Sequence, residues 1–499
     1  MLTELIKKST KIKDGNPAQY LLQATAHKLD KSKSYRKITF GERDPEKSHK
    51  AVLLVGETGT GKTTLINTMI NYMCGVKRED KIWFEITDDQ SKETSAQSQT
   101  SDITVYGVYI KEILIDLTII DTPGYEDTRD IRSHQKIANN LLNLFRSDDG
   151  LSEINAVCLV VNASQTRLSE SQQNAFDAVQ SLFSRDIAEN FVLFFTHSSG
   201  SYPKNALTAI VEAKVTCAVD EKKQPIYFLF NNCQSMPYDE DCDLILEQAW
   251  TLSYNGMEGF FKFLENITTK DLKKTQDVLQ KWKQLEANIS NLQSRVESVE
   301  LKRNELKQTQ DALEKHKKDV EDNNNFEYTV DVSYREKVHI NTDVAKKATC
   351  CSVCQENCHY PGCWWVNDLS WCSVMKNNHC TVCRYKCHYS KHVKEDKIYT
   401  TKTRTETRTY EDLKKKHQDK IDFELSLKGT LKKELQELEK EKRKLIIDAF
   451  HYVETLELIA LKTNSLFLHQ HIDFLIEKLK EINELEKAGY LVNIKKRAG

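Results

Sequence analysis

The sequence predicts an α/β unit with a mostly parallel sheet, followed by an antiparallel coiled-coil arm with a β-ribbon and a cysteine-rich tip. Three observations support this prediction. Short apolar runs alternate with helical patterns up to about residue 266, heptad-spaced apolar residues follow on both sides of a central segment, and that segment holds nine of the 14 cysteines. At 499 residues the chain is too long for one ordinary core.

The predicted sheet depends on five apolar runs that contain no charged residue. Uninterrupted runs of this kind, separated by amphipathic helical segments, are typical of parallel strands that are buried on both faces. The runs are residues 51–55, 117–120, 156–161, 191–195 and 226–230. We assign residues 48–266 to this domain.

Residues 1–47 precede the first of these runs. They are polar and rich in lysine, and they end in a turn-like segment with a glycine and a proline. We expect a polar N-terminal segment with one helix around residues 20–29.

A phosphate-binding pattern follows the first apolar run. Gly-Glu-Thr-Gly-Thr-Gly-Lys-Thr, from Gly56 to Thr63, matches G-x-x-x-x-G-K-[ST] and opens a predicted helix that continues to about residue 73. Gly56 and Gly61 let the backbone N–H groups face the phosphates, Lys62 reaches the terminal phosphates, and the Thr63 hydroxyl binds Mg²⁺. The residues expected to contact nucleotide here are Gly56, Glu57, Thr58, Gly59, Thr60, Gly61, Lys62, Thr63 and Thr64.

A second motif, Asp-Thr-Pro-Gly, begins at Asp121 directly after the second apolar run. Asp121 is placed to hold Mg²⁺ through water, and the N–H group of Gly124 is placed to sense the γ-phosphate, as in P-loop switch proteins. The polar stretch between the two motifs suits a switch loop. We expect Thr100 to be its magnesium-binding and catalytic threonine, with Thr94 and Thr104 as alternatives.

With these motifs the chain resembles the septin-like branch of GTPases, which includes the immunity-associated nucleotide-binding (GIMAP) proteins and the chloroplast import Toc receptors. The resemblance covers about residues 50–266 and rests on GETGTGKTTLIN, DTPG, FTHSSG and FNN. It implies a G domain that binds GTP or GDP with Mg²⁺. In that branch the base is recognised after the fifth and sixth strands, and the matching residues here are Thr196, His197, Asn231 and Asn232.

Two departures from the family pattern affect the expected activity. Ser199 stands where the family often has an acidic residue for the guanine edge, and a serine accepts only a weaker, neutral hydrogen bond, so ATP binding is an alternative. Tyr125 follows Gly124 where a glutamine could orient water. We therefore expect slow GTP hydrolysis that depends on dimerisation across the nucleotide face. His197 matches the family residue that contacts the partner's nucleotide, although it could equally be an ordinary loop residue.

The second half of the chain has the periodicity of long helices. Heptad-spaced apolar residues predict coiled coils at residues 268–322 and 411–482, with a tail at 483–499. Alternating segments at both ends of residues 325–410 predict the strands of a β-ribbon. The symmetric order predicts a hairpin-shaped arm with a metal-bound tip, although each coil could instead pair with its counterpart in a second molecule.

The cysteine-rich segment, residues 350–392, contains the pattern C-x2-C-x3-C-x4-[C/H] twice. Four soft ligands per copy suit tetrahedral zinc, whereas a redox role would require a surrounding βαβ pattern that is absent from the sequence. Cross-bracing between the two copies is open, and the possible substitute ligands are Cys350, Cys372, His359, His379 and His388. The predicted zinc ligands are Cys351, Cys354, Cys358 and Cys363 in the first copy and Cys380, Cys383, Cys387 and His392 in the second.

Composition limits the classes of function. The net charge of −2 does not provide the basic field of an obligate nucleic-acid binder, and the sequence has no apolar stretch of signal-peptide or membrane-spanning length. We expect a cytoplasmic GTP-binding switch that forms a homodimer or higher oligomer through its G domain and presents its arm to a protein partner. A coiled-coil scaffold with unhydrolysed nucleotide is the alternative. The DNA-repair ATPases with a zinc hook fit poorly, because they place nucleotide motifs on both sides of the coils.

Overall fold

The computed structural model describes residues 2–28, 35–86, 103–111, 113, 115–124, 140–141, 144–145, 151–322, 324–341, 347–360, 368–412, 423–463 and 466–498. The chain divides into two compact units. Unit 1 comprises Met1–Leu279 and Ile459–His469, and unit 2 comprises Gln280–Leu458 and Gln470–Gly499. Among the described helices, none combines the length and the apolar character needed to cross a bilayer.

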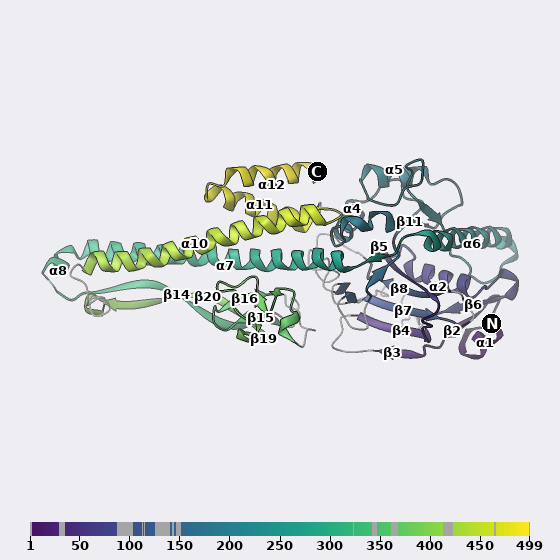
Figure 1. Cartoon of the computed structure of the whole chain (residues 1–499), viewed down its shortest axis with the longest axis horizontal. Coiled ribbons are helices and arrows are strands. Elements are labelled where there is room, and N and C mark those ends of the chain that lie inside the picture. Colours follow the sequence, from purple (N-terminus) through teal and green to yellow (C-terminus); the bar gives the residue numbers. More distant parts are fainter. Residues whose placement is uncertain are drawn as a thin grey trace. The chain divides into compact units, whose positions relative to one another are not determined.

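An eight-stranded sheet forms the centre of unit 1 (Figure 1). Its strands are β3 (Ala26–Lys28), β4 (Tyr35–Gly41), β5 (Ser48–Gly56), β7 (Ile103–Tyr109), β8 (Ile115–Asp121), β10 (Ala156–Asn162), β11 (Phe191–Thr196) and β12 (Tyr227–Leu229). Their spatial order is β12-β11-β10-β5-β8-β7-β4-β3, and neighbours are parallel except β7 with β8 and β3 with β4. The mostly parallel α/β fold predicted from the five apolar runs is confirmed.

Helices cover both faces of this sheet. Along β5 the side chains alternate, so that Leu53 joins one buried cluster and Leu54 joins the other. Burial on both faces explains why these strands are continuously apolar. The helices of the first cluster are α4 (Glu170–Ser181) and α5 (Lys204–Glu212), and those of the second are α2 (Lys62–Met73) and α6 (Asp243–Asn266).

The N-terminal residues are part of unit 1, so the predicted separate polar segment at residues 1–47 is wrong. The helix expected around residues 20–29 is also wrong, because this stretch contributes to two strands. Strand pairing with distant residues decides its conformation, which local helical periodicity cannot report. The main sheet gains β3 and β4, while α1 (Leu2–Lys7) leads into a second sheet made of β1 (Ser9–Lys13), β2 (Ala18–Leu22) and β6 (Ile82–Glu85). A short pair, β9 (Glu153–Ile154) with β13 (Lys270–Asp271), completes unit 1.

Unit 2 contains two long helices, α7 (Lys273–Lys315, in this unit from Gln280) and α10 (Phe423–Ile459), with the short α8 (Lys317–Glu321) after α7. Arg303 Nη2 lies 2.7 Å from Glu439 Oε1, and Lys281 Nζ lies 5.4 Å from the centre of the Tyr452 ring. Because late residues of α7 meet early residues of α10, the two helices run antiparallel within one chain.

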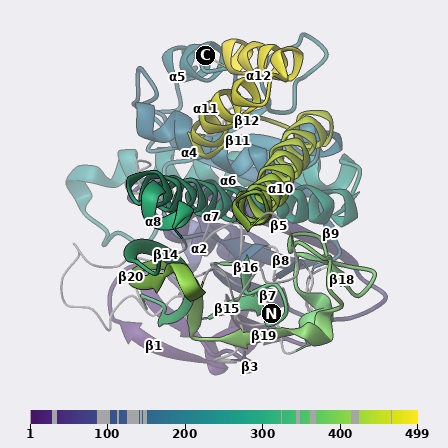
Figure 2. The ribbon, with the colours of Figure 1, turned by 90° about the vertical axis from the view of Figure 1, so that its left-hand side faces the viewer.

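The predicted second coil at residues 411–482 is not continuous. After α10 the chain passes through residues 459–469 of unit 1 and then forms α11 (Leu466–Glu481). The predicted tail at 483–499 is mostly helical, as α12 (Leu485–Ala498), and the Tyr490 hydroxyl donates a hydrogen bond to Glu457 of α10. Figures 1 and 2 show α11 and α12 on one side of the α7–α10 pair and the strands of unit 2 on the other.

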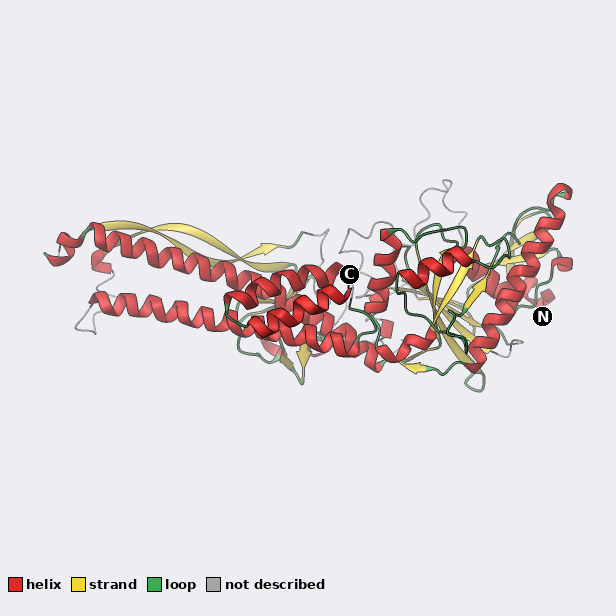
Figure 3. Ribbon diagram, turned by 90° about the horizontal axis from the view of Figure 1, so that it is seen from above, coloured by secondary structure: helices red, strands yellow, loops and turns green. Residues whose placement is uncertain are grey.

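A two-stranded ribbon, β14 (Glu327–His339) with β20 (Lys397–Thr409), runs alongside the helix pair (Figure 3). The chain turns back after α8, so Phe326 and Tyr328 pack near Leu313 late in α7. Further along, Glu356 pairs with Arg295, and Ser373 accepts a hydrogen bond from Gln280. The cysteine-rich segment therefore packs beside residues 280–295 of α7, and its predicted position at the tip of the arm is wrong.

The cysteine-rich segment has its own small sheets. Pairing across β15 and β19 places Cys351 opposite His392, which brings the two sequence copies side by side. The strands are β15 (Ala348–Cys351), β16 (Glu356–His359) and β19 (His392–Glu395) in one sheet, and β17 (Met375–Lys376) and β18 (His379–Cys380) in the other.

Candidate nucleotide site and cysteine cluster

The loop between β5 and α2 requires its glycines. Gly59 and Gly61 have φ angles of +82° and +83°, a left-handed conformation that side chains with a Cβ rarely adopt. A Cβ on Gly56 would lie 2.6 Å from the carbonyl oxygen of Val160 on the neighbouring strand β10. The backbone of this loop therefore curls tightly at the start of α2, in the arrangement that phosphate binding requires.

Lys62 lies inside this loop and is 8% exposed. Its ammonium donates hydrogen bonds to the carbonyl oxygens of Gly56, at 2.8 Å, and Glu57, at 2.9 Å. Burial lowers the pKa of Lys62 to about 8, although the negative charges of Asp121 and Glu57 act in the opposite direction. A phosphate group here would bring the negative charge that this buried ammonium needs.

The Asp-Thr-Pro-Gly motif lies directly beside the loop. Asp121 ends β8 and is 2% exposed, and the Thr122 hydroxyl donates a 2.8 Å hydrogen bond to the carbonyl oxygen of Leu54. A Cβ on Gly124 would lie 2.7 Å from the backbone of Thr58, so only glycine allows this approach. The structure thus brings the predicted magnesium ligand Asp121 and the predicted phosphate sensor Gly124 to the P-loop.

The structure gives different results for the threonines that were predicted to bind Mg²⁺. Thr63 is half-buried at the start of α2, beside Lys62. Thr104, one of the alternatives, is fully buried in β7 and accepts a 3.4 Å hydrogen bond from Arg36, which argues against it as a ligand. Thr100 and Thr94 lie outside the described residues, as does Tyr125.

The segment that follows β11 contacts the P-loop. The Thr196 hydroxyl donates a 2.7 Å hydrogen bond to the carbonyl oxygen of Thr60. His197 is exposed, and its Nε2 atom lies 3.8 Å from where a Cβ on Gly61 would stand. Ser199 is exposed and its hydroxyl contacts that of Ser201 at 2.8 Å, so no charged acceptor occupies this position.

The Asn pair after β12 is held by Ser253 of α6. The Ser253 oxygen accepts a 2.9 Å hydrogen bond from the Asn231 N–H group, and its hydroxyl lies 3.2 Å from Asn232 Oδ1. Ser253 is 1% exposed. Sequence reasoning missed this residue, because a lone serine in a helical pattern gives no sign that it fixes a loop 21 residues earlier.

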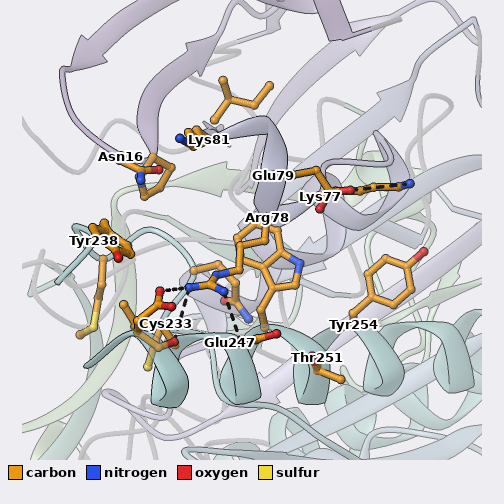
Figure 4. A pocket seen from close by; sticks show the side chains of 17 residues that line it. Asn16, Lys77, Arg78, Glu79, Lys81, Cys233, Tyr238, Glu247, Thr251 and Tyr254 are labelled. Carbon is orange, nitrogen blue, oxygen red and sulfur yellow. Dashed lines mark hydrogen bonds and ion pairs between the residues drawn. The ribbon is translucent and has the colours of Figure 1, made fainter. Parts of the chain in front are cut away.

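A separate pocket of unit 1 lies between η1 (Arg78–Asp80) and the first half of α6 (Figure 4). Arg78 crosses it and pairs with Asp243, and its Nη1 atom lies 3.6 Å from Glu247. Trp250 and Tyr254 add aromatic surface. Because Asp243 and Glu247 neutralise the Arg78 charge within the pocket, this pocket attracts an anion less strongly than the P-loop does.

The cysteine-rich segment brings seven of the eight predicted zinc ligands into two groups, and in each group the sulfur or nitrogen atoms lie within 4.8 Å of one another. Both groups combine candidate ligands from the two sequence copies, which is the cross-braced arrangement that the sequence left open. Cys363 lies outside the described residues. The groups are Cys351, Cys354, Cys383 and Cys387, and Cys358, Cys380, Cys383 and His392.

Backbone N–H groups point at several of these sulfurs. The sulfur of Cys351 accepts from the N–H of Cys354, and that of Cys380 accepts from the N–H of Cys383, both at 3.3 Å. Hydrogen bonds from Cys358 and Cys383 lower the pKa of Cys380, whereas burial raises the pKa of Cys351 to about 12. The N–H contacts themselves favour the thiolate form that binds metal.

Comparison with known proteins identifies the class of the nucleotide-binding domain. Residues 50–241 match the AIG1 family, so this part of the chain is an AIG1-family domain and the resemblance to GIMAP and Toc-type GTPases is confirmed. No curated protein matches the chain.

Solved structures similar to the chain include Toc-type proteins. Two are Toc33 from Arabidopsis thaliana: a dimerization-deficient mutant (16% identity, 44% of this chain and 85% of that one, TM-score 0.31) and a complex with Mg²⁺ and GMPPNP (16%, 44% and 86%, 0.30). A third concerns the chloroplast translocon components atToc33 and psToc159, for whose GTPase activity dimerization is important. Its sequence identity is 15%, the match covers 44% of this chain and 84% of that one, and the TM-score is 0.30.

Proposed function

We propose that this protein is a GTP-binding switch that holds GTP or GDP with Mg²⁺ at the P-loop of unit 1. The observation that carries the proposal is the convergence of four segments at the carboxyl ends of parallel strands. Lys62 follows β5, Asp121 ends β8, Thr196 ends β11, and Asn231 follows β12. Ligands of open α/β sheets bind at this edge, and each segment supplies one part of a nucleotide site.

Base recognition in this proposal falls to the loops after β11 and β12. Thr196 is fixed against the P-loop by its bond to Thr60, and Ser253 holds both Asn231 and Asn232. The amide groups of the Asn pair can both donate and accept hydrogen bonds, as a guanine edge requires. Because Ser199 provides no charge, the preference for guanine over adenine is smaller than with a carboxylate at this position.

Hydrolysis in this proposal is slow in a single molecule and rises on self-association through the G domain. The support is the position of His197, which is exposed beside Gly61. An exposed imidazole at the rim of the phosphate loop is accessible to a second molecule that docks on the same face. An isologous dimer would place each His197 near the nucleotide of its partner.

The cysteine-rich segment, we propose, binds zinc as a structural element. Its buried cluster consists largely of cysteines, with Val374, Met375 and Val382 as the main apolar side chains. A segment with so small a core needs a metal to hold it. The adjoining α7–α10 pair is then available to present a surface to a protein partner.

The test is binding of mant-GTP, mant-GDP and mant-ATP in the presence of Mg²⁺, followed by fluorescence, with the full chain. Lys62→Ala should weaken mant-GTP binding at least about 100-fold, because it removes a buried, charge-assisted contact. The matched control is Lys262→Ala, since Lys262 is an exposed lysine of the same unit that pairs with its helix neighbour Glu258. Equal affinity for mant-ATP, or no binding at all, would overturn the guanine assignment.

Measurements of GTP hydrolysis distinguish the proposed switch from the alternative, a scaffold. Phosphate release per molecule should rise with protein concentration, and His197→Ala should reduce that rise while leaving mant-GDP affinity nearly unchanged. Permanently bound, unhydrolysed nucleotide at every concentration would favour a scaffold in which nucleotide is structural.

A further inference from the structure

The two ligand groups of the cysteine-rich segment share one side chain. Cys383 belongs to both, and it lies on a short loop between β18 and β19, with no exposed surface. Each group has four potential ligands, but the two groups together contain seven different side chains. Two separate tetrahedral ions would need eight.

The spacing of the sulfurs fits tetrahedral zinc. The Sγ atoms of Cys354 and Cys387 are 3.7 Å apart. Two sulfurs bound to one zinc at about 2.3 Å in tetrahedral geometry lie about 3.8 Å from each other. The two cysteines come from different sequence copies, so this distance does not follow from a single local motif.

His392 has the orientation of a zinc ligand. It is 4% exposed, and its Nδ1 atom lies 3.1 Å from the carbonyl oxygen of His388, to which it can donate. With the proton on Nδ1, the buried Nε2 atom keeps its lone pair, and within the described part of the chain it meets the hydrogen-bond criteria with no other atom, so it is free to face the sulfurs of its group. A metal-binding histidine typically donates from its other ring nitrogen in this way.

We propose that the Cys383 thiolate bridges two zinc ions, which makes the cysteine-rich segment a binuclear cluster. One ion is held by Cys351, Cys354, Cys387 and the shared Cys383, and the other by Cys358, Cys380, His392 and the same sulfur. This inference rests on the zinc binding proposed above. A thiolate has enough lone pairs to bind two metals, so seven side chains supply eight metal–ligand bonds.

The bridge makes the effect of losing Cys383 different from the effect of losing any other ligand. Loss of a terminal ligand such as Cys351 directly weakens the binding of one ion, whereas loss of Cys383 removes a ligand from both ions. Cys363 is the rival eighth ligand, because the sequence pattern places it in the first copy. The two hypotheses therefore differ in whether Cys363 binds metal.

The experiment uses the full chain loaded with an NMR-active cadmium isotope, with isotope-labelled cysteine. The bridge predicts two cadmium signals, both of which correlate with the β-protons of Cys383, and a coupling between the two metals. Two signals without a shared cysteine, one of them correlated with Cys363, would overturn the bridge and leave zinc binding intact. A single bound ion would also overturn it, and no bound metal would overturn zinc binding itself.

Metal content of variants provides a check that does not depend on NMR assignment. Cys363→Ala should keep both zinc ions and the cadmium spectrum of the unmodified protein, and its loss of one ion would contradict the bridge. Cys351→Ser should lower occupancy of one ion, and Cys383→Ser should lower both. If Cys383→Ser fails to fold, the spectrum of the unmodified chain and the Cys363→Ala result still decide the question.

Discussion

The P-loop and the cysteine-rich segment both bind ions or phosphates in our proposal, but they differ in what holds them in shape. The P-loop connects β5 to α2, and both elements are buried in large apolar clusters. The cysteine-rich segment has a small cluster in which the cysteines themselves are the main buried side chains. In our proposal the first site is organised by the protein core before its ligand arrives, whereas the second depends on zinc for order.

Removal of zinc by a chelator tests this difference with the largest expected effect. Structural zinc contributes roughly 10–16 kcal/mol in small zinc-dependent domains, so residues 347–360 and 368–395 should lose protection from hydrogen exchange. The affinity of unit 1 for mant-GDP should change less than about twofold, because no proposed zinc ligand belongs to unit 1. A segment that stays protected without metal would show that its polypeptide core is sufficient.

Gly56→Ala tests how tightly the core holds the P-loop. The added Cβ would lie 2.6 Å from the Val160 carbonyl oxygen, so β5 or β10 must shift. We expect unit 1 to lose about 1–3 kcal/mol of unfolding free energy, measured by hydrogen exchange of β5 and α2. The control is Gly489→Ala in α12, where a Cβ meets nothing within 4 Å. That change should stabilise its helix by up to about 1 kcal/mol, and an equal loss in both variants would contradict the steric explanation.

Raising the pH from about 7 to 9 should weaken mant-GDP binding about tenfold. The pKa of Lys62 is lowered to about 8 by burial, so its ammonium is mostly deprotonated at pH 9, while bound phosphates raise that pKa again. The effect of the same pH change on folding stability has the opposite sign. The charged form is disfavoured by burial, so unfolding free energy rises as pH increases from about 8 towards the ordinary pKa of lysine. Lys62→Met should bind weakly with little dependence on pH, and a similar pH profile in both proteins would exclude Lys62 as the cause.

The Arg303–Glu439 contact tests the antiparallel helix pair with the smallest expected effect. Both side chains are about half exposed, so a double-mutant cycle with Arg303→Ala and Glu439→Ala should give a coupling of about 0.2–1 kcal/mol. The coupling should not depend on protein concentration, because both residues belong to one chain. A coupling that disappears on dilution, together with dissociation of a dimer, would show that the helices pair between molecules.

The sequence predicted the core of unit 1 well, because burial on both faces leaves a local signature. Each charge-free run is a strand, and the P-loop stands between the expected strand and helix. The prediction failed at β2 and β3, where the pattern fitted a helix. Ala18 of β2 pairs with Ile82, and Ala26 of β3 pairs with Thr39. Contacts of this kind are made with residues that local periodicity does not include.

The members of the two candidate metal groups could be predicted individually but not as groups. The repeated spacing of cysteines predicts Cys351 and Cys383 as ligands, yet spacing alone cannot show that strand pairing places the two copies against each other. The position of the cluster was missed for a similar reason. The ribbon could have extended the helices or folded back along them, and contacts between distant residues, such as the packing of Tyr328 near Leu313, decide between these paths.

Because residues 459–469 belong to unit 1, some contacts of that unit can form only late in synthesis. Lys462 forms a buried ion pair with Asp177, and Ala460 accepts a 3.1 Å hydrogen bond from Arg185. A ribosome that adds about 5–20 residues per second makes Lys462 roughly 10–40 seconds after residue 279. During that interval the nascent unit 1 lacks the Lys462–Asp177 ion pair, so its last native contacts form only after the long helices have been translated.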